Sequence, residues 1–473
     1  MDLRKKWYND YQQNQPNKFN EELIYGLRKE DDMVQYLIDV CKALEAIPYI
    51  KYKGFSRKTN ENEFKQLGYK NISDSRMDLV EFHFEINFKG ETSKMKMPIF
   101  IPKWINNYFY IINGNKFYPI YQHVESSTYS TRESLILKSL LMPIIVKMKN
   151  GVKLIDIDGN EYQSRLYQLN LFDHKNNFLF YYFATMGFKD TIKFFGYEKN
   201  IKIIKLSNNK IKEKAIIFPI NKQVGIAVGK NKFIRNKKFK YFVTSLLDVF
   251  NRKTPIDRIN DINYWKVKLG SIFTKNSNNQ LAKSETVILS FNRILDERTK
   301  KNLLINQEDK ENIYCLIRWM INNFDSLMKK DNLSLLNKRV RLCEYIINQF
   351  VKRMSSSTYR ILNSKTLTMN KIKGVLKPPS MIIVSDLQKS KLLRYNSNVN
   401  DLDLFNVALR WSNRGPSSLG ESGKKTVSVV YRGINTSHFG RLSLNTVSSS
   451  DPGMSGCFSP FVKTDGWHYV KIK

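Results

Sequence analysis

Two aspartates two positions apart are the first side chains in this sequence that could do chemistry. Asp156 and Asp158 stand in the stretch DIDGN, and paired carboxylates can bind a divalent cation. An Asp-Gly step between alternating stretches is, however, the usual sequence of a tight hairpin turn. No aspartates are clustered in the D-x-D-x-D manner of a catalytic magnesium site. We therefore predict a hairpin turn here and no metal site.

Histidine and cysteine give no stronger indication of catalysis. The five histidines are scattered, and the four cysteines (Cys41, Cys315, Cys343 and Cys457) lack the C-x-x-C spacing of a zinc site. The sequence signatures of nucleotide-binding loops, zinc proteases and serine hydrolases are absent. We expect reduced thiols, no cofactor on this chain and no chemistry by this chain alone. The beginning of the sequence has no apolar leader, so we expect a soluble protein and no membrane partner.

Cations dominate the composition. The 78 Lys and Arg residues against 43 Asp and Glu give a formal net charge of +35. Such an excess favours a polyanionic partner, either nucleic acid or an anionic membrane surface. The richness in Lys, Asn and Ile also resembles the coding bias of an AT-rich genome. The densest cluster, GKNKFIRNKKFKYF at 229–242, fits either a surface that binds nucleic acid or a strand edge protected by lysines.

Hydrophobic spacing predicts a mixed α+β chain of several domains, because 473 residues exceed one ordinary core. Apolar residues three and four apart predict helices over about 20–50, 312–328 and 342–354. Alternation predicts strands over 78–112, with an Asn-Gly hairpin turn at Asn113 and Gly114. A second unit is expected to begin within 133–148.

The stretch from Arg432 to Phe461, RGINTSHFGRLSLNTVSSSDPGMSGCFSPF, differs from the rest in being rich in Gly and Ser. A flexible tail would be one explanation, but the aromatic residues in it favour a packed loop system. Ordered loops on a rigid scaffold often carry function.

This stretch resembles the fork of the β subunit of multisubunit, DNA-dependent RNA polymerases. The family's sequence in the fork is R-D-V-H-P-T-H-Y-G-R. The present sequence matches it in order from Arg432, and the match closes with Ser437, His438, Phe439, Gly440 and Arg441. Within the same stretch Asp451 takes the place of a family glutamate, and Gly456 that of a later family glycine. Further similar segments occur in the same order as in the family: Gln122 after the Asn-Gly turn, LLNKRVR at 335–341 with Glu344, and ALRWSNRGPSSLG at 408–420.

The resemblance implies a particular architecture. It implies an RNA polymerase β-type protrusion from residues 1–130 and 338–400, a lobe at 131–337 and a fork at 401–473. The chain would be the N-terminal part of a split β subunit, most like those of jumbo bacteriophages, acting in the cytoplasm of the infected host cell or carried in the virion. Its partners would be the C-terminal part of β, β′-like subunits, template DNA and nascent RNA, with a promoter-specificity factor as a further candidate.

The resemblance also implies roles for single residues. Nucleic-acid contacts are expected from Arg414, Lys424, Lys425, Arg432, Arg441 and Gln122, and structural roles in the fork from His438, Gly440, Asp451 and Gly456. The catalytic magnesium would be held by another subunit. Ser412 and Gly415 replace a histidine and an arginine of the rifamycin pocket, so the enzyme is expected to be rifamycin-insensitive. The alternative from another class is a stand-alone basic viral DNA-binding protein.

Overall fold

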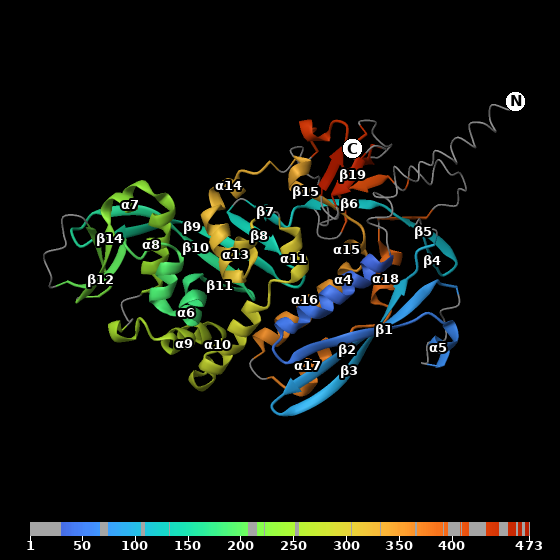
Figure 1. Cartoon of the computed structure of the whole chain (residues 1–473), viewed down its shortest axis with the longest axis horizontal. Helices are drawn as coiled ribbons and strands as arrows, with labels where there is room; N and C mark the ends of the chain where they lie inside the picture. Colours follow the sequence, from blue (N-terminus) through green and yellow to red (C-terminus); the bar gives the residue numbers. More distant parts are fainter. Residues whose placement is uncertain are drawn as a thin grey trace.

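A computed structural model shows a chain of helices and several separate β-sheets (Figure 1). The following residues are described: 30–66, 74–105, 109–131, 133–206, 215–221, 223–250, 255–303, 305–331, 333–364, 367–390, 392–395, 407, 409–415, 432–443, 453–459, 462–465 and 469–472. Their mixed α+β composition confirms the predicted class. Among these residues no helix combines the length and the apolar character that crossing a bilayer requires.

The first sheet is a three-stranded antiparallel meander that carries a helix. Its strands are β1 (Ile50–Lys58), β2 (Met77–Phe88) and β3 (Glu91–Pro102), and α4 (Glu30–Ala43) precedes them. The predicted hairpin turn is present between β4 (Tyr110–Ile112) and β5 (Asn115–Pro119), where Asn113 and Gly114 have φ of 49° and 76°. Positive φ at both central residues is the conformation that Asn-Gly favours. The strand and turn predictions for 78–112 are confirmed.

A five-stranded antiparallel sheet follows. Its order is β11-β10-β9-β8-β7, from β7 (Thr128–Ser130), β8 (Ser134–Lys138), β9 (Pro143–Ile155), β10 (Glu161–Leu171) and β11 (His174–Asn177). DIDGN closes the β9–β10 hairpin, as predicted: one Asp156 oxygen accepts hydrogen bonds from the amides of Asp158 and Asn160. Although burial opposes ionisation, these and further hydrogen bonds lower the pKa of Asp156. The aspartate thus stabilises a turn.

Helices and a small sheet complete this second region. The small sheet joins β12 (Ile201–Lys205), β14 (Val224–Gly229) and β13 (Ala215–Pro219). The principal helices are α6 (Leu179–Phe194), α9 (Ile262–Phe273), α10 (Ser277–Asn292), α11 (Glu297–Asn302), α13 (Ile313–Asn322) and α14 (Phe324–Met328). The predicted 312–328 helix is therefore present, with a break at Asn323.

The chain then returns to the first sheet. The returning elements are β15 (Lys338–Arg341), α15 (Cys343–Ile346), α16 (Asn348–Asn363), α17 (Met369–Val375), α18 (Ile382–Lys389) and β16 (Leu393–Tyr395). Here α18 packs along β3, the Phe100 amide donates to the Ser380 carbonyl at 2.9 Å, and β16 pairs with β5. The 342–354 helix is confirmed as α15 and α16. Segments on both sides of the second region therefore share one body.

A fourth sheet joins segments from opposite ends of the sequence. Its order is β15-β6-β17-β18, with β6 (Tyr121–Glu125), β17 (Arg410–Ser412) and β18 (Ser455–Cys457). The pairing of β17 with β6 is parallel, and the other two pairings are antiparallel. A C-terminal hairpin of β19 (Val462–Asp465) and β20 (Tyr469–Ile472) lies near β15. The predicted division into protrusion, lobe and fork stays a prediction, although β7 already belongs to the sheet of the second region before residue 131.

Candidate nucleic-acid interface

Gln122, at the centre of the fourth sheet, links three of the motifs. Its side chain is fully buried; Nε2 donates to the Arg414 carbonyl at 2.8 Å, and Oε1 accepts from Arg341 Nε at 2.7 Å. One amide thus joins β6, β15 and the loop after β17. The sequence predicts that Gln122 contacts nucleic acid. Both ends of its side-chain amide are used in these internal hydrogen bonds, so the contact stays a prediction that would require a rearrangement of the amide.

A buried charge cluster supports this link. Arg339 Nη1 lies 2.5 Å from Glu344 Oε1, and Arg341 Nη1 lies 3.7 Å from Glu344 Oε2. Burial alone would raise the pKa of Glu344, but the two guanidinium groups outweigh it and lower the pKa to about 2. Burial lowers the pKa of Arg341 to about 10. Arg339 and Arg341 therefore hold the strand in place, because both guanidinium groups pair with the buried Glu344 carboxylate.

The loop that leaves β17 has a tightly defined start. The Arg414 amide donates to Ser412 Oγ at 3.0 Å, and its side chain is exposed. Gly415 has a φ of +109°, and an added Cβ would lie 2.5 Å from Leu392 Cδ1 and 2.9 Å from Gln122 Nε2. Only glycine fits both this conformation and this space. Arg414 is thus presented outward from a fixed backbone, in a position suited to a phosphate contact.

Close packing of Gly456 explains its place in the motif. An added Cβ at Gly456 would lie 2.9 Å from Trp411 Cζ2, because β18 runs directly beside the indole. The Trp411 ring is also stacked on His123, with ring centroids 4.5 Å apart. Burial, with smaller effects of Lys338 and His438, lowers the pKa of His123 well below its usual value. This layer of Gly456, Trp411 and neutral His123 is structural, and neither Trp411 nor His123 was singled out from the sequence.

The turn at residues 435–439, which the sequence matches to the family's fork and which is called the fork turn below, is held against the segment before β15. Asn435 caps the 3₁₀ turn η7 (Thr436–His438), and its Nδ2 donates to Asp331 Oδ2 at 2.7 Å. Ser437 Oγ accepts from the Leu335 amide at 3.0 Å. His438 Nδ1 accepts from the Asn435 amide, so Nε2 carries the hydrogen and donates to the Leu333 carbonyl at 3.0 Å. These contacts fix the position of the His438 ring, and its structural role in the fork stays a prediction.

The remaining predicted residues differ in their surroundings. Arg441 Nη1 donates to the Ser437 carbonyl at 2.9 Å, and the exposed Gly440 has a φ of +72°. Arg432 is half-buried, and its carbonyl oxygen lies 2.7 Å from the position of an added Cβ on Gly453. The last three of the predicted residues lie outside the described ranges: Lys424, Lys425 and Asp451.

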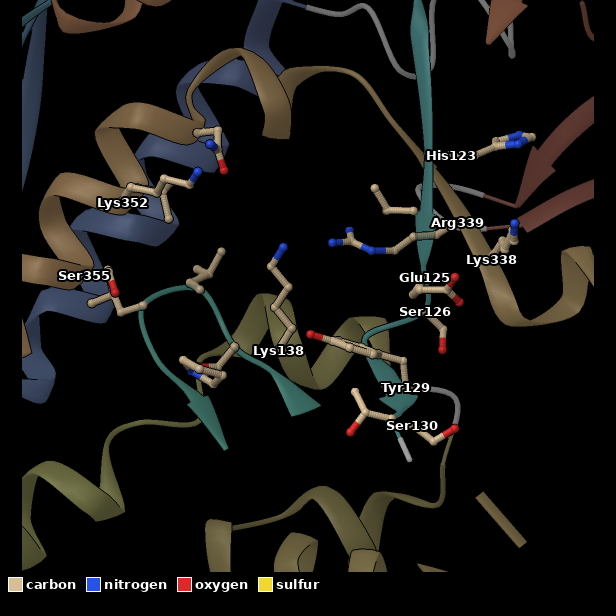
Figure 2. Close-up of a pocket in the computed structure, with 18 of the residues that line it drawn as sticks. His123, Glu125, Ser126, Tyr129, Ser130, Lys138, Lys338, Arg339, Lys352 and Ser355 are labelled. Carbon is tan, nitrogen blue, oxygen red and sulfur yellow. The ribbon is translucent and has the colours of Figure 1, made fainter. Parts of the chain in front are cut away.

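A cavity of about 780 Å³ opens beside the fourth sheet. Lys138, Arg339 and Lys352 reach it from β8, β15 and α16, and the Tyr129 hydroxyl points into it (Figure 2). Glu125 also lines the cavity, and burial raises its pKa. Cations from three elements therefore line the cavity, and one of them, Arg339, is already paired with Glu344. Lys138 and Lys352 gave no sequence signal, since each stands within an ordinary amphipathic pattern.

The lysine-rich 229–242 segment forms two helices, α7 (Lys230–Arg235) and α8 (Lys237–Val249). The strand-edge interpretation is therefore wrong. The stacking part of the nucleic-acid interpretation is wrong too, because Phe233 and Phe239 are buried. Lys232 and Lys240 lie over aromatic rings of the same core. The other four cations of the segment are exposed and form a basic surface: Lys230, Arg235, Lys237 and Lys238.

The described residues hold no group of three or more His, Cys, Asp or Glu side chains arranged to bind a metal ion.

No curated protein sequence matches the chain. A sequence model of the family described as "Non-virion RNA polymerase subunit" does match, over residues 2–467. Because this match covers nearly the whole sequence, the chain belongs to the family of non-virion RNA polymerase subunits.

Proposed function

We propose that this polymerase subunit is the N-terminal part of a split β subunit of a DNA-directed enzyme. It would form one jaw of the DNA cleft and the fork beside the RNA–DNA hybrid. The observation that carries the proposal is the spatial meeting of the motifs. Gln122, the LLNKRVR strand and the loop at Arg414 lie up to 292 residues apart in sequence, yet one buried amide joins them. This meeting supports the proposal, because a β-type fork would bring the same motifs together.

In this proposal the buried junction positions the loop and the exposed cations bind nucleic acid. Arg414 leaves a backbone held by Gln122 and Gly415, and Lys424 and Lys425 follow it in the sequence. Cations on such a loop would neutralise phosphates and fix the register of the nucleic acid without reading its sequence. Arg432 and Arg441 are further proposed contacts, beside the locked fork turn.

The catalytic role is assigned to a partner. We propose that the magnesium ion of nucleotide addition is held by a β′-like subunit, and that the C-terminal part of β completes the cleft. Template DNA, nascent RNA and a promoter-specificity factor are the other proposed partners. The family description, non-virion, favours action in the infected cell over packaging in the virion.

The alternative, a stand-alone basic DNA-binding protein, predicts a self-sufficient chain. Affinity purification of the tagged chain from infected cells, followed by mass spectrometry, distinguishes the two. We expect other polymerase subunits in fixed stoichiometry with the chain, retained at a salt concentration that removes DNA. Recovery of the chain alone, or with DNA only, would favour the alternative.

A further inference from the structure

Three large apolar side chains are strongly exposed on the fork turn and on the segment that holds it. Leu336 is 70% exposed, Ile434 71% and Phe439 55%. Leu336 lies in the 3₁₀ turn η5 (Leu335–Asn337), whereas Ile434 and Phe439 flank η7. Scattered single apolar residues on a surface need no explanation, but a group on one small unit marks an interaction site.

This unit is held rigidly by the hydrogen bonds of the fork turn. Leu335, next to Leu336, donates its amide to Ser437 Oγ, and Asn435, next to Ile434, donates to Asp331. His438, next to Phe439, donates to the Leu333 carbonyl. Each exposed side chain is therefore adjacent in sequence to a contact that joins the fork turn to the segment at 331–335. A rigid apolar surface loses little conformational entropy on binding, which favours association.

The chemistry of the surface selects a protein partner. Leu and Ile side chains neither pair with phosphate nor stack on bases, so a nucleic acid would leave two of the three apolar groups unused. Next to the unit in the sequence stand the exposed Lys329 and Lys330 and the half-exposed Arg441, which outnumber the exposed carboxylate there, Asp331. A complementary partner would bring apolar side chains flanked by carboxylates. Family membership supplies such a class of partner, because a polymerase subunit works within a complex.

We propose that Leu336, Ile434 and Phe439 form a docking surface for another subunit of the polymerase. The inference rests on family membership and is independent of which residues contact DNA. Exposed apolar anchors at the centre of an interface commonly account for most of the binding free energy. Loss of such anchors weakens association by about thirtyfold or more.

The test uses the complex purified through the tagged chain. The variant Ile434→Asp/Phe439→Asp introduces charge only at exposed positions. The matched control is Ile155→Asp/Ile234→Asp, because Ile155 and Ile234, in the second region, are 54% and 59% exposed. We expect the first variant to lose at least one polymerase subunit, with at least thirtyfold weaker retention, and the control to retain all of them. Retention of every subunit by both variants would overturn the proposal.

A second measurement does not depend on the folding of that variant. A photo-crosslinking amino acid replaces Phe439 in the otherwise native chain and, as a control, Ile234. We expect crosslinks from position 439, and not from 234, to an apolar segment of another polymerase subunit. Crosslinks to nucleic acid or only to the same chain would overturn the docking surface. If even the unmodified chain recovers no other subunit, the assignment to a polymerase complex itself is contradicted, which separates that failure from a misplaced surface.

Discussion

Replacement of Gln122 by methionine tests the link between the motifs. Methionine keeps the volume of the buried side chain, so the loss of packing is small. It removes the hydrogen bonds to the Arg414 carbonyl and to Arg341 Nε. Each buried group deprived of its partner costs about 1–3 kcal/mol. Because Arg341 keeps Glu344 at 3.7 Å, we expect the lower part of the summed range, about 2–4 kcal/mol.

The assay must report on the loop as well as on global stability, since several domains need not unfold together. We expect Gln122→Met to lower the denaturation midpoint of the chain and to accelerate amide hydrogen exchange in the strand and loop at 409–415. In Gln122→Glu the carboxylate can still accept a hydrogen bond from Arg341, but it repels the Arg414 carbonyl oxygen. This variant should therefore keep the link to β15 and lose the link to the loop. Gln163→Met, on the exposed side of β10, is the control. Unchanged exchange at 409–415 in Gln122→Met would refute the role of this amide.

Three further predictions concern the buried charge, the loop lysines and the drug pocket. The pKa of Glu344 is lowered to about 2 from 4.5, so its contribution to stability is complete above about pH 5.5 and is lost as the pH falls toward 2. Denaturation midpoints of the native chain should fall across this range. The variant Glu344→Gln should be less stable by about 3–5 kcal/mol throughout and should lack this pH-dependent loss. Replacement of Lys424 and Lys425 by Ala should flatten the salt dependence of template retention by up to about two units without changing promoter choice, and an altered preference at an unchanged slope would contradict a phosphate contact. The assembled enzyme should transcribe at rifampicin concentrations that stop a bacterial control, because Ser412 and Gly415 lack the side chains of the family's pocket; equal sensitivity would mean that this alignment is wrong.

Local sequence patterns predicted the elements whose structure depends on neighbouring residues. The Asn113–Gly114 turn and the Asp156 turn follow from backbone preference and nearby hydrogen bonds, and both are present. The helices around 312–328 and 342–354 followed from apolar spacing. The 229–242 segment was not resolved by pattern, because alternating cations and aromatic residues are compatible with a strand edge as well as with two short helices.

The site depends on tertiary contacts between segments that are distant in the sequence. Local sequence patterns could therefore not predict which of its side chains are buried. Whether Gln122 faces nucleic acid or the interior depends on Arg341 and Arg414, 219 and 292 residues away. Arg339 and Arg341 of LLNKRVR can be buried because Glu344 pairs with both guanidinium groups. Trp411 carried no signal of its own, since its role arises from contact with His123 and Gly456.

The most direct test of the central claim is RNA synthesis on a DNA template by the purified complex and by the chain alone. The complex, isolated through the tagged chain from infected cells, should incorporate ribonucleotides only when DNA and magnesium are present. The isolated chain should bind DNA with a strong dependence on salt and synthesise no RNA. Templated synthesis by the isolated chain would contradict the account, as would a pure complex that is inactive on every DNA template.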